Sequence, residues 1–198
     1  MLRLLVLAAL VAGCASPDTE PAVVEPELAE VPAPPNLEDA AAVEGEDSLL
    51  LDGEGLRVLA PSTSTRLLAY GTPIEDVVGA VAAIEGEPVD RGTMAECGAG
   101  PIDYVRWPDG LTLHAQGGEF VGWALRDLEG ERSSLSTMGG LALGTSRADL
   151  EGGPVTVEIS ETTLGEEFAA GEVYGLLGSL DADDEVASLW SGVSCNFR

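Results

Sequence analysis

Hydrophobic and polar positions alternate most clearly between Tyr104 and Arg126, where two turn signals separate three short segments. Pro108-Asp109-Gly110 supplies residues preferred in tight turns, and Gly117-Gly118 suits a two-residue hairpin turn with positive φ. The segments between the turns are rich in the β-branched and aromatic residues that favour strands. The pattern therefore predicts a three-stranded antiparallel meander.

Alternation also divides the predicted meander into two faces, because successive strand residues point to opposite sides. One face is apolar and is the expected core, formed by Val105, Trp107, Leu111, Leu113, Ala115 and Phe120. The other combines aromatic, cationic and polar side chains: Tyr104, Arg106, Thr112, His114, Gln116, Val121 and Trp123. A face that meets only water seldom has this composition, so we predict that the second face binds a partner.

The glycine turn also predicts the register of the strands. With two residues in the turn, Ala115 pairs with Phe120. Further along, Thr112 pairs with Trp123, which places Trp123 on the predicted binding face. The strand pattern does not say which face the helices cover. The opposite assignment, with Trp123 in the core and Trp107 exposed, therefore stays open.

A helix is predicted shortly before the meander. Thr72 is suited to cap this helix, Pro73 suits its first turn, and Glu75 completes a capping box. Apolar residues at helical spacing form one face: Ile74, Val77, Val78, Val81 and Ile84. Gly86 is placed to end the helix, which we expect to lie against a sheet.

Two blocks of the sequence recur in the same order. Residues 68–77 match residues 141–150, and residues 118–123 match residues 171–176. The recurrence indicates a duplicated unit, with chance similarity between glycine-rich segments as the alternative.

The duplication predicts an α+β domain at residues 49–198. It contains two degenerate repeats, at about 65–128 and 138–198, each a short helix with an antiparallel β-hairpin or meander. The repeat alignment places Tyr174 at the position of Val121, so Tyr174 extends the predicted binding face.

The start of each repeat resembles a motif of the BamE-like outer-membrane lipoproteins and the β-lactamase inhibitor proteins, in which a Gly-Thr-x-x-Asp-Val helix start leads into an antiparallel sheet. The matching residues are Gly71, Thr72, Asp76, Val77, Gly86 and Pro88, with Gly144, Thr145, Asp149 and Leu150 in the second copy. The resemblance implies protein binding on a sheet face rather than catalysis. The second helix departs from the family by being short, since Gly152, Gly153 and Pro154 stop it.

The N-terminus has the pattern of an export signal. Arg3 supplies one positive charge, residues 4–12 are apolar, and Gly13 and Cys14 follow. The apolar run is too short for a permanent membrane span. The segment resembles the lipobox of bacterial lipoproteins, which implies that residues 1–13 are a signal peptide and that Cys14 is lipidated. A chance cysteine at the end of an ordinary signal is the alternative.

The lipobox resemblance implies a lipid-anchored protein of the cell envelope. Ala15, rather than Asp, follows the cysteine, which implies the outer membrane in a Gram-negative cell and otherwise the outer face of the cytoplasmic membrane. Residues 14–48 are rich in Pro, Ala and acidic residues and contain no aromatic residue. Because such a composition forms no core, we expect a disordered acidic tether, with an acidic recognition tail as the alternative.

The charge of the chain limits its partners. Formal net charge is -26, and every one of the nine basic residues is Arg. Nucleic acids and anionic membrane surfaces require cationic patches, so neither is an expected partner. We therefore expect contact with the membrane through the N-terminal lipid and with a protein partner through the domain.

Cysteine and histidine offer little chemistry. Cys97 and Cys195 remain once Cys14 is lipidated, and two thiols in an exported protein predict a disulfide. Redox catalysis would need a reactive pair such as Cys-x-x-Cys, which the sequence lacks. His114 is the only histidine, so no histidine cluster is available for zinc. It is either a solvent-facing strand residue or part of the binding face.

Two groups of acidic residues complete the candidate chemistry. Residues 181–185 could bind calcium, but an EF-hand loop needs Gly and an acid where Val186 and Gly192 stand. Asp103 and Asp109 could serve as a glycosidase pair, yet they adjoin turns, where Asp is favoured for backbone hydrogen bonding. No metal or cofactor is expected.

The predicted function is that of a protein-binding or envelope-assembly module rather than an enzyme. A small envelope hydrolase and a structural spacer without a specific ligand are the alternatives. An enzyme should bring titratable side chains together in a pocket, a binding module should have an open aromatic face, and a spacer should have neither.

Overall fold

The computed structural model describes residues 46–61, 64–127, 132–178 and 185–195, which belong to one unit spanning residues 42–198. Half of the described residues lie in strands and 12% in helices. The predicted α+β class, with a helix and a hairpin or meander in each repeat, is therefore wrong: this part of the chain is mostly antiparallel β-sheet. The prediction missed the strands at residues 48–52, 90–94 and 186–192 because polar and apolar residues do not alternate regularly in them.

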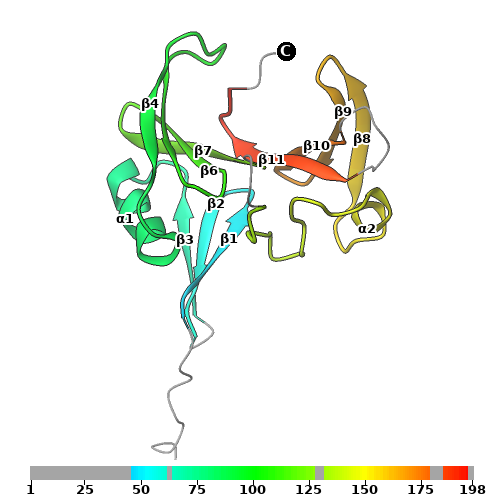
Figure 1. Cartoon of the computed structure of the whole chain (residues 1–198), viewed down its shortest axis with the longest axis horizontal. Coiled ribbons are helices and arrows are strands. Elements are labelled where there is room, and N and C mark those ends of the chain that lie inside the picture. Colours follow the sequence, from blue (N-terminus) through cyan, green and yellow to red (C-terminus); the bar gives the residue numbers. More distant parts are fainter. Residues whose placement is uncertain (1–45, 62–63, 128–131, 179–184, 196–198) are drawn as a thin grey trace, which may run out of the picture. The chain divides into compact units, whose positions relative to one another are not determined.

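The strands form two antiparallel sheets (Figure 1). The smaller sheet joins β1 (Ser48–Asp52), β2 (Gly55–Leu59) and β3 (Thr65–Ala69). The larger sheet has eight strands in the order β4-β5-β6-β7-β11-β10-β9-β8. Its strands are β4 (Asp90–Met94), β5 (Ile102–Arg106), β6 (Leu111–Gln116), β7 (Glu119–Arg126), β8 (Val157–Thr162), β9 (Gly165–Ala170), β10 (Val173–Leu177) and β11 (Val186–Gly192). The helices are α1 (Ile74–Glu85) and α2 (Arg147–Glu151).

The predicted meander is formed by β5, β6 and β7. Ala115 pairs with Phe120, as the glycine turn predicts. The register then shifts by one residue at Val121, so that Trp123 pairs with Leu113 instead of the predicted Thr112. Because a one-residue shift moves a strand residue to the opposite side of the sheet, Trp123 belongs to the core face.

The two halves of the larger sheet meet where β7 pairs with β11. The segment before each helix bonds to one of these central strands. The Gly71 N–H donates to the Phe120 carbonyl, and the Gly144 N–H donates to the Val186 carbonyl, both over 2.8 Å. When the two halves are matched by this hydrogen bond, β11 has the position in the second half that β7 has in the first. The predicted alignment, which gave Tyr174 on β10 a position equivalent to one on β7, is therefore wrong.

The two helix starts lie where the sequence predicts them, but their caps differ. Pro73 occupies the N-cap of α1 and no side chain caps this helix, so the predicted capping role of Thr72 is wrong. The backbone of Thr72 instead joins β7, its carbonyl accepting from the Phe120 N–H over 2.8 Å. In α2 the Ser146 hydroxyl accepts from the Asp149 N–H over 3.1 Å, an ordinary helix cap.

One hydrophobic core joins the larger sheet to α1 and to the smaller sheet. Its members include Val77, Val78 and Val81 of α1 and Leu51, Leu56 and Leu68 of the smaller sheet. Trp107 and Trp123 are both 0% exposed. The Trp107 indole N–H donates to the Gly86 carbonyl over 2.8 Å, and that of Trp123 to the Asp52 carbonyl over 2.9 Å. Both tryptophans therefore lie on the core side of the sheet.

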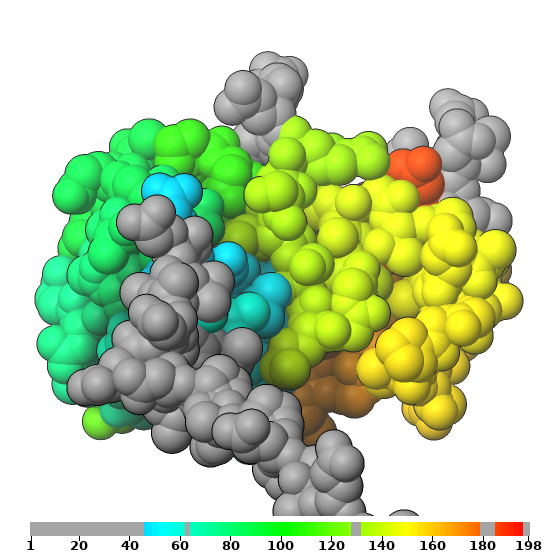
Figure 2. All heavy atoms as spheres, turned by 90° about the horizontal axis from the view of Figure 1, so that it is seen from below, coloured from blue at the N-terminus to red at the C-terminus, as the bar shows by residue number. Residues whose placement is uncertain are grey.

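Residues 132–146 lie beside the smaller sheet and cover the same face of the larger sheet. Figure 2 shows them in yellow-green between β1 in cyan and the yellow region of α2 and β8. The Leu51 N–H donates to the Ser136 carbonyl over 2.9 Å, and Leu135 and Leu143 are buried in the core. Both helices and the smaller sheet thus lie against one face of the larger sheet, and no described helix covers the other face.

Candidate functional site

The helix-free side of the larger sheet, here called the open face, carries a row of side chains that crosses all eight strands. Strand register places them opposite one another from β4 to β8 in the order Asp90, Arg106, Thr112, Ala124, Trp190, Tyr174, Ala169 and Glu158. The large side chains lie to either side of Thr112 and Ala124. The middle of the row therefore consists of small residues between two groups of larger ones.

An arginine and a tyrosine form one of these groups. The Arg106 guanidinium carbon lies 5.1 Å from the centre of the Tyr104 ring, within the range of a cation–π contact. Asp90 holds both residues, accepting from the Tyr104 hydroxyl over 3.1 Å and from the Arg106 guanidinium over 3.4 Å. These contacts limit the freedom of the Arg106 side chain and hold it on the open face.

Two stacked aromatic rings form the other group. The ring centres of Tyr174 and Trp190 are 6.4 Å apart and the planes differ by 20°. Tyr174 is 36% exposed, whereas Trp190 is 5% exposed. Tyr174 can therefore meet a partner directly, with Trp190 as its support.

A cavity of about 230 Å³ opens beside Arg106, where the small residues Thr112 and Ala124 form the middle of the row. The residues that define its chemistry are Met94, Arg106, Thr112, His114, Arg126 and Cys195. No carboxylate is among the described residues that line it, although the chain as a whole carries a net charge of -26. We call this cavity the arginine pocket.

His114 forms part of the wall of the arginine pocket but is only 4% exposed. Its Nδ1 lies 3.0 Å from the Val193 carbonyl oxygen and donates to it, since a carbonyl can only accept. Burial, together with the charges of Arg126 and Arg106, lowers the pKa of His114 to about 4, although the hydrogen bond to Val193 opposes this shift. The imidazole is therefore neutral at neutral pH, and its main contact is with the segment after β11.

That segment is held directly against the sheet. The Val193 N–H donates to the Val121 carbonyl over 2.8 Å. A Cβ atom added to Gly122 would lie 2.2 Å from the Val193 carbonyl oxygen, so only glycine permits this approach. The contact brings Cys195 to the arginine pocket from a distant part of the sequence.

Cys195 and Cys97 are neighbouring free thiols. Burial and a hydrogen bond with the Cys97 thiol raise the pKa of Cys195 to about 11. Because the thiolate is the reactive form, Cys195 is a poor nucleophile at neutral pH. The close approach of the two thiols fits the predicted disulfide, which stays a prediction.

The five predicted binding-face residues have different positions. Tyr104, Arg106 and Tyr174 lie on the open face, and His114 lies there but is buried. Trp123 lies in the core and is unavailable to a partner, because the shift at Val121 turns it away from the open face.

Sequence reasoning missed Trp190 and Arg126. Trp190 lies on β11, for which no strand was predicted at these residues, because the adjacent apolar residues Leu189 and Trp190 break any polar–apolar alternation. Arg126 was treated as the end of the meander. Alternation from Ala124, once the shift in β7 is known, assigns it to the open face.

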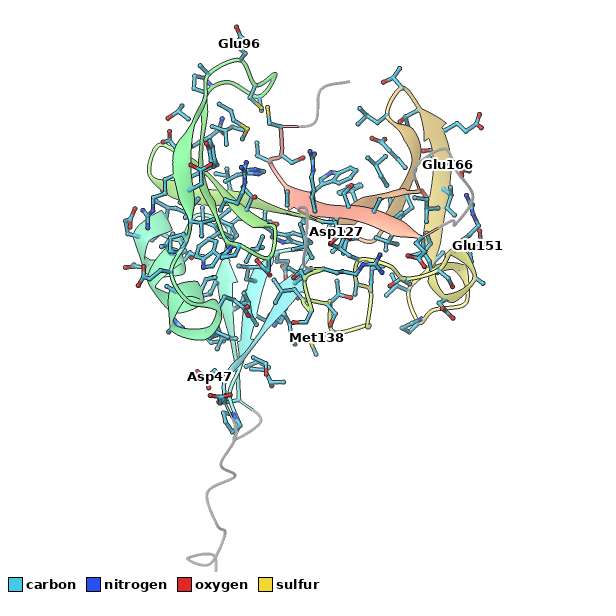
Figure 3. All side chains as sticks on the ribbon, viewed as in Figure 1. Asp47, Glu96, Asp127, Met138, Glu151 and Glu166 are labelled. Atoms are coloured by element: carbon cyan, nitrogen blue, oxygen red, sulfur yellow. The ribbon has the colours of Figure 1, made fainter. Side chains whose placement is uncertain are left out.

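A second cavity, of about 350 Å³, lies on the core side, where β1, the segment around Met138 and α2 meet. Met138 is labelled in Figure 3 and is 67% exposed. The cavity wall contains two carboxylates, each already bound. Asp52 is paired with Arg57 over 2.5 Å, and Asp149 accepts from the Ser146 hydroxyl over 2.7 Å.

The other residues considered for catalysis or metal binding do not come together in one site either. Asp103 accepts from the Thr93 hydroxyl over 2.6 Å, while Asp109 accepts from the Ser133 hydroxyl over 2.7 Å. Among the described residues, no three His, Cys, Asp or Glu side chains are grouped to hold a metal ion. Residues 181–184 of the acidic run considered for calcium lie outside the described residues. In the part of the chain that the structure covers, no helix has the length and apolar character needed to cross a membrane.

Comparison with protein-family models, with curated proteins and with solved structures finds no match to this chain. The resemblances in the sequence therefore remain predictions, and the open face and its arginine pocket carry the functional argument.

Proposed function

We propose that this chain is a lipid-anchored cell-envelope protein whose domain binds another protein through the open face. The observation that carries the proposal is the combination of a helix-free sheet face with an exposed aromatic stack at Tyr174 and an ordered arginine at Arg106. Tyrosine, tryptophan and arginine are the residues that dominate binding energy at protein interfaces.

The size of the open face also suits a protein. Eight strands spaced by about 4.8 Å span roughly 34 Å, enough for the roughly 800 Å² that each partner buries in an ordinary interface. A structural spacer would not need an aromatic stack supported in this way. Acidic residues dominate the rest of the molecule, which favours a protein partner over nucleic acid.

The membrane part of the proposal rests on residues 1–14, which lie outside the described residues together with most of the predicted tether. Replacing Cys14 with Ser should abolish lipidation, because serine has no thiol to receive the lipid. We expect the variant to leave the membrane fraction and to lose incorporation of labelled fatty acid. Cys195→Ser is the matched control and should fractionate as the parent protein does. Unchanged fractionation of the Cys14 variant would reject the anchor.

The binding part can be tested by site-specific photocrosslinking in cells. With a benzoylphenylalanine at position 174 on the open face, we expect a discrete adduct with an envelope protein. The same probe at position 138, which is more exposed but lies on the core side, should give no such adduct.

Ala124→Trp provides the blocking variant, since a large side chain would fill the middle of the row. We expect it to remove the adduct formed from position 174 while the melting temperature changes little. An adduct that survives this substitution would contradict binding on the open face. Absence of any adduct would favour the spacer, and turnover of a substrate lost with Ala124→Trp would favour the hydrolase.

A further inference from the structure

The arginine pocket reverses the charge of its surroundings. Figure 3 shows Glu96, Glu151 and Glu166 at the periphery of the described part, whereas Asp127, which follows β7 and pairs with Arg132, lies nearer the centre. Among the described residues, the pocket is lined by Arg106 and Arg126 and by no carboxylate, and Asp90 contacts Arg106 from outside the lining. In a protein with a net charge of -26, this arrangement is unlike the average surface.

Strand geometry explains how the two arginines reach one site. Arg106 pairs with Thr112, which pairs with Ala124, and Arg126 follows two residues later on the same side of β7. The two Cα positions are therefore roughly 12 Å apart across the diagonal of the sheet. Small side chains, Thr112 and Ala124, lie between them, and both arginines line the same cavity.

The pocket also contains hydrogen-bonding groups suited to an oxyanion. Guanidinium groups bind carboxylates through charge-assisted hydrogen bonds. Thr112 lies between the two arginines and is 9% exposed. Ser188 does not line the pocket but pairs with Arg126 on the neighbouring strand, and its buried hydroxyl has no hydrogen-bond partner among the described residues.

The volume limits what can enter. Sites for cofactors and drug-sized ligands usually measure about 300–1,000 Å³, and the arginine pocket measures about 230 Å³. One side chain or one small anion fits this space better than a cofactor does. The location on the open face favours a side chain that belongs to a docked protein.

We propose that the arginine pocket receives the carboxylate of an acidic side chain presented by the protein partner. This proposal rests on the proposed function and specifies the chemistry of the partner. The acidic side chain should project from an otherwise neutral or basic surface, because a polyacidic surface would be repelled by the net charge of this chain.

His114 provides a direct measurement of occupancy, because it is the only histidine and its ring lies in the pocket wall. A bound carboxylate stabilises the imidazolium and should raise the pKa of His114 from about 4. The full chain would be titrated at constant ionic strength with N-acetyl-aspartate methylamide while the ring signals are followed by NMR. The neutral control is N-acetyl-asparagine methylamide, and inorganic phosphate tests a free oxyanion.

We expect saturable shifts with the aspartate probe and none with the asparagine probe. Arg126→Gln should lower the affinity for the aspartate probe about tenfold or more, as expected for the loss of a charge-assisted hydrogen bond. Arg66→Gln removes the same charge from an exposed position on β3 and should leave the affinity unchanged. Unchanged melting temperatures would show that both variants fold.

A second experiment tests the effect on the protein partner and follows the photocrosslinked adduct formed from position 174. The proposal predicts that Arg126→Gln and the aspartate probe each reduce the adduct. If Ala124→Trp removes the adduct but Arg126→Gln and the probe do not, the proposed function stands and the acidic side chain is rejected. If phosphate binds as tightly as the aspartate probe without affecting the adduct, the pocket is a small-anion site. Failure of every probe to bind, or of any adduct to form, would also overturn the inference.

Discussion

Replacing Trp123 with Ala is expected to lower the free energy of unfolding by about 3–5 kcal/mol, the usual range for removal of a buried tryptophan. The side chain is 0% exposed, and its indole N–H bonds to the Asp52 carbonyl. The substitution would leave a cavity between the two sheets and an unpaired carbonyl at the end of β1. Urea unfolding followed by circular dichroism measures the loss.

Tyr174→Ala is the matched comparison on the open face. Tyr174 is partly exposed and its main contact is the stack on Trp190, so we expect a loss of only about 0.5–1.5 kcal/mol. The affinity for the partner should fall more with Tyr174→Ala than with Trp123→Ala. If Trp123→Ala costs less stability than Tyr174→Ala, the register shift that buries Trp123 is incorrect.

Closing the disulfide between Cys97 and Cys195 is expected to stabilise the protein by about 4.7 kcal/mol, the loop-entropy value for a closed loop of roughly 100 residues. The neighbouring thiols require little movement to bond. The denaturation midpoint of the oxidised protein should therefore exceed that of the reduced protein. Because the raised pKa of Cys195 keeps its thiol protonated near neutral pH, oxidation in air should be slow without a catalyst.

Free-thiol labelling of the mature, unreduced protein tests the bond itself. No reactive thiol is expected from Cys97 or Cys195. Cys195→Ser should abolish the difference in midpoint between oxidising and reducing conditions. Two reactive thiols in protein isolated from the envelope would contradict the prediction.

Local features of the fold could be predicted from the sequence. The apolar spacing and Gly86 predicted α1 closely, and the two turns predicted β5, β6 and β7. In these segments the residues that decide the structure are neighbours in the chain. The same reasoning could not detect the shift at Val121, because a single extra strand residue changes no turn and no pattern.

The missed strands show why the fold class was wrong. β4, with the sequence Asp-Arg-Gly-Thr-Met, lies at one end of the larger sheet and has little apolar surface to produce alternation. β11, at the centre of this sheet, was missed because its sequence does not alternate: Leu189 and Trp190 are adjacent apolar residues. Such strands are specified by pairing with their neighbours more than by their own sequence, so pattern analysis assigns them to loops.

The candidate site was predicted only in part for a similar reason. Alternation within one meander was enough to assign Tyr104 and Arg106 to a common face. The arginine pocket also needs Met94 and Cys195, which strand pairing and the contact of His114 with Val193 bring to the same place. No spacing in the sequence predicts that these residues lie together in the folded protein.

The central pairing of β7 with β11 has a consequence for folding. β4 to β7 follow one another and can pair locally, whereas β11 begins sixty residues after the end of β7. Sheets that depend on distant pairing fold slowly, on the order of milliseconds to seconds. Until β11 arrives, one edge of β7 has unpaired backbone groups, which makes the half-formed sheet a template for aggregation. We therefore expect the newly made chain to depend on chaperones during the interval before β11 joins the sheet.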